Sequence, residues 1–302
     1  MRACGRLVNG AMTAAFLTTI LFSISAVCGR RTAQIMGGNE ANFWRLLFAA
    51  TLLALYAHLF GGGVSGAGFG IFLISGAIGF GIGDAALFQA LPRIGSRLSV
   101  MMVLCLSSPI GGLLEWMWLG TRLRPVETIC GVVILCGVAV ALAPSGHIHT
   151  PRREFIVGIM FGFVAAVCQA LGAVLSRKAF LIGPNIDGIT AAYQRILGGV
   201  VVTAAVFTYV KLRHTSMASA AEKRKAWPWV LANGLSGPTL GVSCYQWALK
   251  TTPTGVVLPI VALTPIVIIP FARYTEGEWP TARSIIGSVI AVAGAAALAL
   301  SR

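Results

Sequence analysis

The chain has 302 residues, of which 57% are hydrophobic and only 11% are charged. Soluble domains carry about 25% charged residues, so this composition argues against a soluble protein. The formal net charge of +14 raises the question of nucleic-acid binding, but the 23 basic residues are scattered over short connections between apolar runs. Such residues are typical of interfacial anchors and topology signals, so no nucleic-acid partner is expected.

The first apolar run follows Arg2 and Arg6, as in a signal peptide. However, the end of this run, SAVCGRR at 25–31, is similar to a later segment, GAVLSRK at 172–178. A segment with a partner elsewhere in the sequence is expected to be retained, here as the first helix of the protein.

Apolar runs of membrane length then continue through most of the sequence, and a membrane-spanning helix needs roughly 20 such residues. The fold class expected is therefore an all-α integral membrane protein with ten transmembrane helices. They are predicted at 8–28, 41–60, 68–91, 98–119, 126–144, 156–177, 188–210, 227–249, 252–274 and 282–300.

Two stretches indicate an internal duplication. ANFWRLL at 41–47 returns as AAYQRIL at 191–197, and each copy places one arginine, Arg45 or Arg195, shortly inside an apolar run. GDAALFQAL at 83–91 has a weaker partner in GVSCYQWAL at 241–249. An internal repeat of this kind determines the architecture of the fold.

The polar stretch APSGHIHTPRRE at 143–154 separates the two copies. We place the first repeat at 1–145 and the second at 146–302, with five helices in each. An odd number of spans per repeat means that the second copy lies upside down relative to the first. Inverted repeats are common in secondary transporters, whose substrate site lies near the middle of the membrane between the repeats.

At these residues the chain resembles the EamA-type transporters of the drug/metabolite transporter superfamily. The resemblance rests on NFWRLLFA in the second helix, GDAALFQALPRIGSR at the end of the third, the Ser-Pro pair of the fourth, and the stretch 248–294 with Glu278 after the ninth. The first half departs from the family pattern at Thr121, where the family usually has a glutamate. The resemblance implies two EamA-like repeats and transport of a small metabolite or drug-like solute.

Two carboxylates, Asp84 and Glu115, fall inside predicted spans. At a rise of about 1.5 Å per residue, Asp84 and Arg45 lie roughly 10 and 6 Å in from one side of the membrane. Glu115 and Arg195 lie roughly 6 and 10 Å in from the other side. Ionisable groups at such depths need partners or water. We therefore predict ion pairs Arg45–Asp84 and Arg195–Glu115, which could serve as opposing gates and couple transport to protons.

Simpler roles remain open for these charges, because a long side chain near a helix end can reach the interface without taking part in transport. Other polar residues are predicted to line a central cavity between helices 1–4 and 6–9. Tryptophans near helix ends more often form the interfacial belt, although Trp44, Trp116 and Trp247 could stack on a ring-bearing solute. The polar cavity candidates are Ser23, Ser25, Gln89, Gln169, Tyr245 and Gln246.

No cofactor or metal is expected. GFGIGD at 79–84 is not a phosphate loop, because no strand precedes it. His147 and His149 have no third ligand nearby. The seven cysteines include no CxxC pair and read as small buried hydrophobic residues. No Ser/His/Asp or Cys/His set can be argued, and the chain is not expected to be an enzyme.

The sequence thus predicts a multi-pass carrier of the cell membrane that moves a small solute by alternating access. Three alternatives stay open: a membrane enzyme acting on lipid-linked substrates, a structural subunit of a membrane complex, and a channel. The lipid bilayer, the solute and protons are its expected partners. The orientation of the termini stays open, because the basic residues favour termini outside whereas the family resemblance implies termini in the cytoplasm.

Overall fold

The computed structural model describes residues 2–119, 125–142, 151–213, 220–252, 254–276 and 281–300. Within these residues every regular element is a helix, as the sequence predicts. The first half holds α1 (Arg2–Met36), α2 (Gly38–Leu59), α3 (Phe69–Gly76), the π-helix η1 (Ala77–Gly83), α4 (Asp84–Leu119) and α5 (Pro125–Leu142). The second half holds α6 (Arg152–Ile182), α7 (Gly188–Arg213), α8 (Ala220–Gly234), the π-helix η2 (Leu235–Gly241), α9 (Val242–Thr251), α10 (Thr254–Val261), α11 (Thr264–Glu276) and α12 (Ala282–Leu300).

The predicted spans correspond to these helices with three kinds of change. α4 includes the end of the third predicted span and the whole of the fourth, which are joined across a turn at Gly95. The third and eighth predicted spans each contain a π-helix, η1 or η2, which joins the flanking α-helices without a break. The ninth, which contains Pro259, Pro265 and Pro270, is divided into α10 and α11 just before Pro265. Proline removes a backbone hydrogen bond, which explains a break at this place.

By length and hydropathy alone, four helical stretches of the described residues could cross a membrane. One of these stretches, Phe69–Trp118, covers two of the ten predicted spans, and among the described residues Thr128–Ala141 and Ala282–Gly294 are apolar but shorter. The four stretches are Thr13–Met36, Phe69–Trp118, Arg152–Ile182 and Gly188–Arg213.

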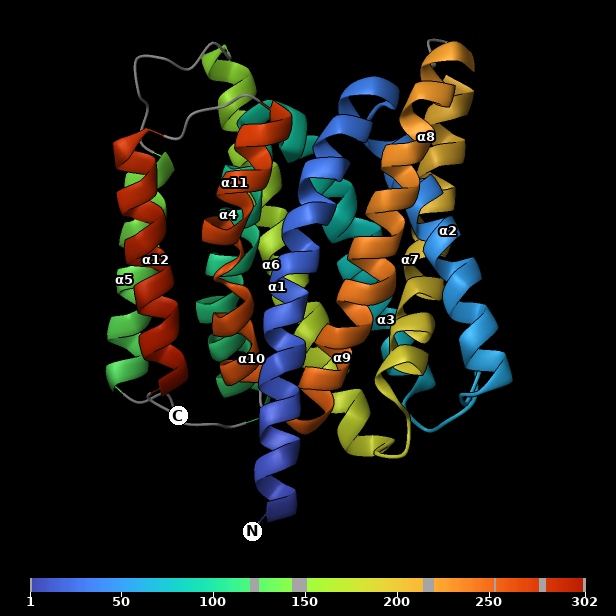
Figure 1. Cartoon of the computed structure of the whole chain (residues 1–302), viewed down its shortest axis with the longest axis vertical. Coiled ribbons are helices and arrows are strands. Elements are labelled where there is room, and N and C mark those ends of the chain that lie inside the picture. Colours follow the sequence, from blue (N-terminus) through green and yellow to red (C-terminus); the bar gives the residue numbers. More distant parts are fainter. Residues whose placement is uncertain are drawn as a thin grey trace.

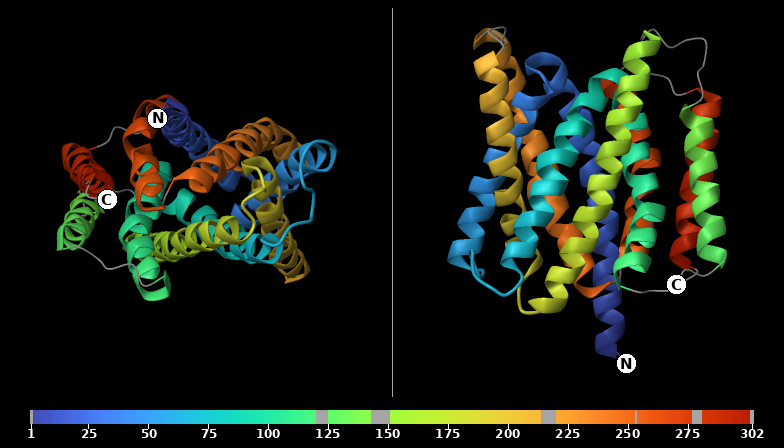
Figure 2. Two further views of the ribbon diagram at one scale, coloured as in Figure 1. Left: turned by 90° about the horizontal axis from the view of Figure 1, so that it is seen from below. Right: turned by 180° about the vertical axis from the view of Figure 1, so that it is seen from behind.

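The helices form one bundle in which corresponding helices of the two halves run in opposite directions (Figure 1). α1 and α6 are antiparallel, and so are α2 and α7. The N-terminal end of α1 and the C-terminal end of α12 lie at the same end of the bundle. α5 and α12 form a pair at one side, which the views in Figure 2 confirm. The remaining helices therefore surround the centre of the molecule.

The surface of the bundle is apolar where a soluble protein would be polar. Large hydrophobic side chains such as Leu55, Met160 and Val201 are exposed on the outside. The interior holds many small residues, especially alanines of α2 and α6, which let helices approach closely. An apolar exterior around closely packed helices is the arrangement that a lipid bilayer requires.

Two glycines make the tight turns in the first half. Gly37 separates α1 from α2 with φ 83° and ψ 149°, and Gly95 turns the chain inside α4 with φ 82° and ψ 161°. This backbone region is essentially restricted to glycine, because a side chain there is strained. The connections can therefore be as short as one residue.

Replacing Gly37 by alanine tests this strain in isolation. A Cβ atom at Gly37 would meet no other atom within 4 Å, so only the backbone conformation is penalised. We expect Gly37→Ala to lower the free energy of unfolding by about 1–3 kcal/mol, measured by SDS titration in detergent micelles. Gly62→Ala is the control, since Gly62 has no positive φ and its nearest contact is at 3.8 Å. Equal stability of both variants would contradict the strain argument.

Candidate functional site

A cavity lies between the two halves of the bundle. The space open to the centres of water-sized molecules is about 90 Å³, which is room for several waters. Its walls come from α1, α2, η1 and α4 of the first half and from α6, α7, η2 and α9 of the second. The wall is mostly apolar, but three ionisable side chains that share it carry charge: Arg45, Asp84 and Arg195.

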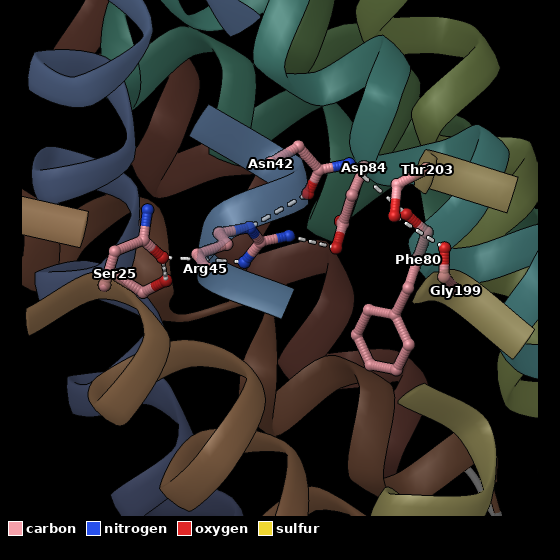
Figure 3. A network of polar contacts seen from close by, with 8 residues as sticks. Ser25, Asn42, Arg45, Phe80, Asp84, Gly199 and Thr203 are labelled. Atoms are coloured by element: carbon pink, nitrogen blue, oxygen red, sulfur yellow. Dashed lines mark hydrogen bonds and ion pairs between the residues drawn. The ribbon is translucent and has the colours of Figure 1, made fainter. Parts of the chain in front are cut away.

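Arg45 is brought to this cavity by the inward face of α2. Asn42, Arg45 and Leu46 are all buried, at the three- and four-residue spacing of one helix face. The guanidinium of Arg45 donates a hydrogen bond to the carboxylate of Asp84, which begins α4, and the two form an ion pair. The predicted Arg45–Asp84 pair is therefore confirmed as a contact. Figure 3 shows the guanidinium between Asn42 and Asp84.

Neutral amides complete the surroundings of Arg45. Its Nε donates to Asn42 Oδ1 over 3.0 Å, and its Nη1 lies 3.5 Å from Asn233 Oδ1, which also accepts from Ser25 Oγ at 2.8 Å. The ring of Phe88 lies 4.6 Å from the guanidinium carbon, close enough for a cation–π contact. A network of donors, acceptors and one counter-charge thus holds Arg45 at a depth where an isolated charge would be costly.

Arg195 enters the same cavity from α7, where only 2% of its surface is exposed. Its guanidinium carbon lies 4.9 Å from the centre of the Phe80 ring of η1. With the amide oxygen of Gln246 turned toward it, Gln246 accepts hydrogen bonds from Arg195 Nη1 at 2.9 Å and Nε at 3.3 Å. Among the described residues no carboxylate lies within 4 Å of Arg195.

The predicted Arg195–Glu115 pair falls partly outside the described residues, because the side chain of Glu115 is not described. Arg195 lines the same cavity as Arg45 and Asp84. The depth estimate from the sequence placed the two arginines near opposite sides of the membrane. In the fold, side chains from both halves reach inward and meet at one cavity.

Of the other predicted cavity residues, Ser25, Gln169 and Tyr245 line the cavity, and Gln246 contacts it through Arg195. Gln89 does not line it. Its amide instead donates to Asn39 Oδ1 at 3.3 Å and accepts from Arg93 at 3.0 Å, near the turn between α1 and α2. The side-chain period of α4 explains this, because Gln89 lies on a different face from Asp84, Leu87 and Phe88.

Ser23 and the three tryptophans also lie elsewhere. Ser23 donates to the backbone of Thr19 and Thr264, while Trp44 packs against Phe43 and Trp227. Trp116 and Trp247 are about half exposed on the outer surface. Their positions are those expected of an interfacial belt.

Four residues around the arginines were not singled out from the sequence: Asn42, Phe80, Phe88 and Asn233. Asn42 precedes Arg45 by three positions, and a polar residue at that spacing in an apolar helix is a usable signal. The two phenylalanines and Asn233 carry no such signal, because their contact with the arginines depends on how separate helices pack.

The groups in the cavity can bind a molecule through charge, hydrogen bonds and ring contacts. Among the described residues no group of three or more His, Cys, Asp or Glu side chains could hold a metal ion. The cysteines whose side chains are described form no disulfides: Cys28, Cys105, Cys130, Cys136, Cys168 and Cys244. What the cavity offers is a buried ion pair, a second guanidinium, amide groups and aromatic rings.

Comparison with known proteins agrees with this architecture. The model of the EamA-like transporter family matches residues 9–143 and again residues 156–300. A solved structure, titled only as the crystal structure of a protein, is similar with a TM-score of 0.65 at 17% sequence identity, over 96% of each chain. At this identity the likeness concerns the fold alone. No curated protein sequence matches the chain.

Proposed function

The chain belongs to the EamA-like transporter family and is a multi-pass membrane transporter, and from this premise we propose that it carries a small solute by alternating access. The observation that carries the proposal is the cavity between the two halves, which contains the Arg45–Asp84 ion pair. Each half contributes walls, so a movement of one half against the other would open the cavity to alternate sides.

The proposed architecture has ten spans in two inverted repeats, residues 1–145 and 146–302. The antiparallel courses of α1 and α6, and of α2 and α7, support the inversion. The third and eighth spans each pass through a seven-residue π-helix at the cavity, η1 or η2. Segments of this kind often occur at functional sites, and we propose that these two are bending points during access. The membrane we propose is the cell membrane.

Asp84 is the residue we assign to proton coupling. It is the acidic member of the ion pair, it lines the cavity, and 18% of its side-chain surface is exposed. Protonation of its carboxylate would remove the counter-charge of Arg45 and weaken the contact between α2 and α4. Movement of the two halves would then depend on the proton occupancy of Asp84.

The test measures solute-driven proton movement. The purified chain is reconstituted in liposomes that contain the pH-sensitive dye pyranine, and pooled metabolites are added outside. We expect at least one pool to change the internal pH, and a variant with both Arg45→Gln and Asp84→Asn to abolish the change, because it has no titratable group in the pair. The double variant is used since it leaves no buried charge unpaired.

Arg93→Gln is the matched control, because Arg93 pairs with Glu154 at a more exposed position outside the cavity wall. It should retain the signal of the unaltered chain. An unchanged proton signal in the double variant would overturn the assignment of Asp84. Solute flux without any proton movement would overturn coupling while leaving transport itself in place.

A further inference from the structure

The two halves of the cavity differ at one position that matters for charge. Asp84 is the first residue after the π-helix η1, and Val242 is the first residue after the π-helix η2. Both side chains line the cavity. The first half therefore supplies a carboxylate next to its π-helix, whereas the second half has an apolar side chain in the corresponding place.

The arginines reflect this difference. Arg45 has the carboxylate of Asp84 as a partner, but the hydrogen-bond partner of Arg195 is the neutral amide of Gln246. Phe80 adds a cation–π contact to Arg195, which is weaker than an ion pair. The described cavity wall holds two guanidiniums, Arg45 and Arg195, but one carboxylate, and that carboxylate is in contact with Arg45. A buried guanidinium without a carboxylate in contact is costly, and the cost falls when an anion approaches.

Tyr245 gives an independent indication at the same place. Its side chain lines the cavity, is 1% exposed, and has a hydroxyl group with no hydrogen-bond partner among the described residues. Arg195 lines the same cavity. A buried hydroxyl without a partner is unfavourable, and an anion beside Arg195 could accept a hydrogen bond from it.

We propose that the solute is an organic anion whose carboxylate binds between Arg195 and Tyr245 and whose apolar body packs against the remaining wall. This proposal rests on the proposed function and adds the chemical class of the solute. The wall next to these donors is apolar and partly aromatic, with Phe22, Val103 and Leu104 among its residues. A ring-bearing carboxylate fits this combination better than a small inorganic anion, which would leave the apolar surface uncovered.

The test compares acids with their amides, which have nearly the same shape and no charge. Thermal unfolding of the purified full chain in detergent is followed with benzoate, phenylacetate and indole-3-acetate. The matched compounds are benzamide, phenylacetamide and indole-3-acetamide, with sodium chloride as the inorganic anion. We expect at least one acid to raise the melting temperature with increasing concentration, and its amide and chloride to have little effect.

Variants connect the effect to the two donors. Arg195→Gln should abolish the stabilisation by the acid, and Tyr245→Phe should weaken its apparent affinity about tenfold, the loss of one hydrogen bond to a charged group. Val242→Asp supplies an internal carboxylate in the second half and should also abolish stabilisation by the acid. Arg93→Gln, which removes an arginine outside the cavity wall, should leave the effect unchanged.

The inference is overturned if the amides or chloride stabilise as well as the acids, if no acid stabilises, or if the effect persists in both Arg195→Gln and Tyr245→Phe. Flux measurements separate this result from the proposed function. Binding of an acid without its transport in liposomes would support the anion site and reject the carrier. Transport of neutral solutes with no preference for acids would support the carrier and reject the anion site.

Discussion

Removing the carboxylate of Asp84 alone is expected to lower the free energy of unfolding by about 3 kcal/mol. Asp84→Asn leaves the guanidinium of Arg45, which is 5% exposed, without its counter-charge. Breaking a buried pair on one side costs about 3–5 kcal/mol, and the lower end applies because the cavity gives Asp84 some contact with water. Unfolding by SDS in detergent micelles, followed by circular dichroism, measures the change.

The double variant gives the sharper result. Arg45→Gln together with Asp84→Asn removes both charges and leaves two amides that can hydrogen-bond to each other and to Asn42. We expect it to be more stable than either single variant, so that the coupling energy of the cycle is about 2 kcal/mol or more. Additive effects of the two substitutions would show that the pair contributes nothing as a pair.

The ion pair Arg93–Glu154 is the internal standard for this experiment. It joins the same two residue classes over 2.9 Å, but its side chains are 26% and 48% exposed. Exposed pairs contribute about 0–1 kcal/mol. Glu154→Gln should therefore lower the free energy of unfolding by much less than Asp84→Asn. Equal losses in the two variants would argue that burial of the pair is not the cause of the large effect at Asp84.

The Arg45–Asp84 contact could be predicted from the sequence because the two residues have opposite charges at similar depth. Both residues lie in long apolar runs, and the helical rise places them at similar distances from the same side of the membrane. Two costly charges of opposite sign at similar depth have a strong reason to meet. The family resemblance could also be found from the sequence, because the order of the apolar runs and the duplication are visible there.

Lateral position could not be predicted in this way. Depth does not say which neighbour a helix face meets, so Gln89 was expected in the cavity although it faces Asn39 and Arg93. The π-helices η1 and η2 also gave no signal, because seven residues are too few turns for a change of hydrophobic period to be recognised. Their geometry depends on packing against other helices, and for η1 the most extensive contact is with α7.

α7 also packs against α3, and this contact leads to the second large effect, at Gly76. A Cβ atom built on Gly76 would lie 1.6 Å from the carbonyl oxygen of Arg195 and 2.7 Å from its Cα, so no side chain fits while α3 and α7 stay in place. Backbone atoms cannot move aside as a flexible side chain can. We expect Gly76→Ala to lower the free energy of unfolding by about 3 kcal/mol, and Gly76→Val to prevent accumulation of folded protein.

Gly70 provides the matched control in the same helix. It is exposed and a Cβ atom there would meet nothing within 4 Å, so Gly70→Ala should leave the stability unchanged or raise it by up to about 1 kcal/mol through helix propensity. The two alanine substitutions are thus expected to have effects of opposite sign on the free energy of unfolding, which SDS unfolding can resolve.

If Gly76→Ala were also neutral, α3 and α7 would have to separate freely, and the backbone of Arg195 would not be fixed against the first half. The position of its guanidinium beside Phe80 depends on that close approach, because Gly79 and Gly172 leave space for Arg195 Nη2 only at this helix separation.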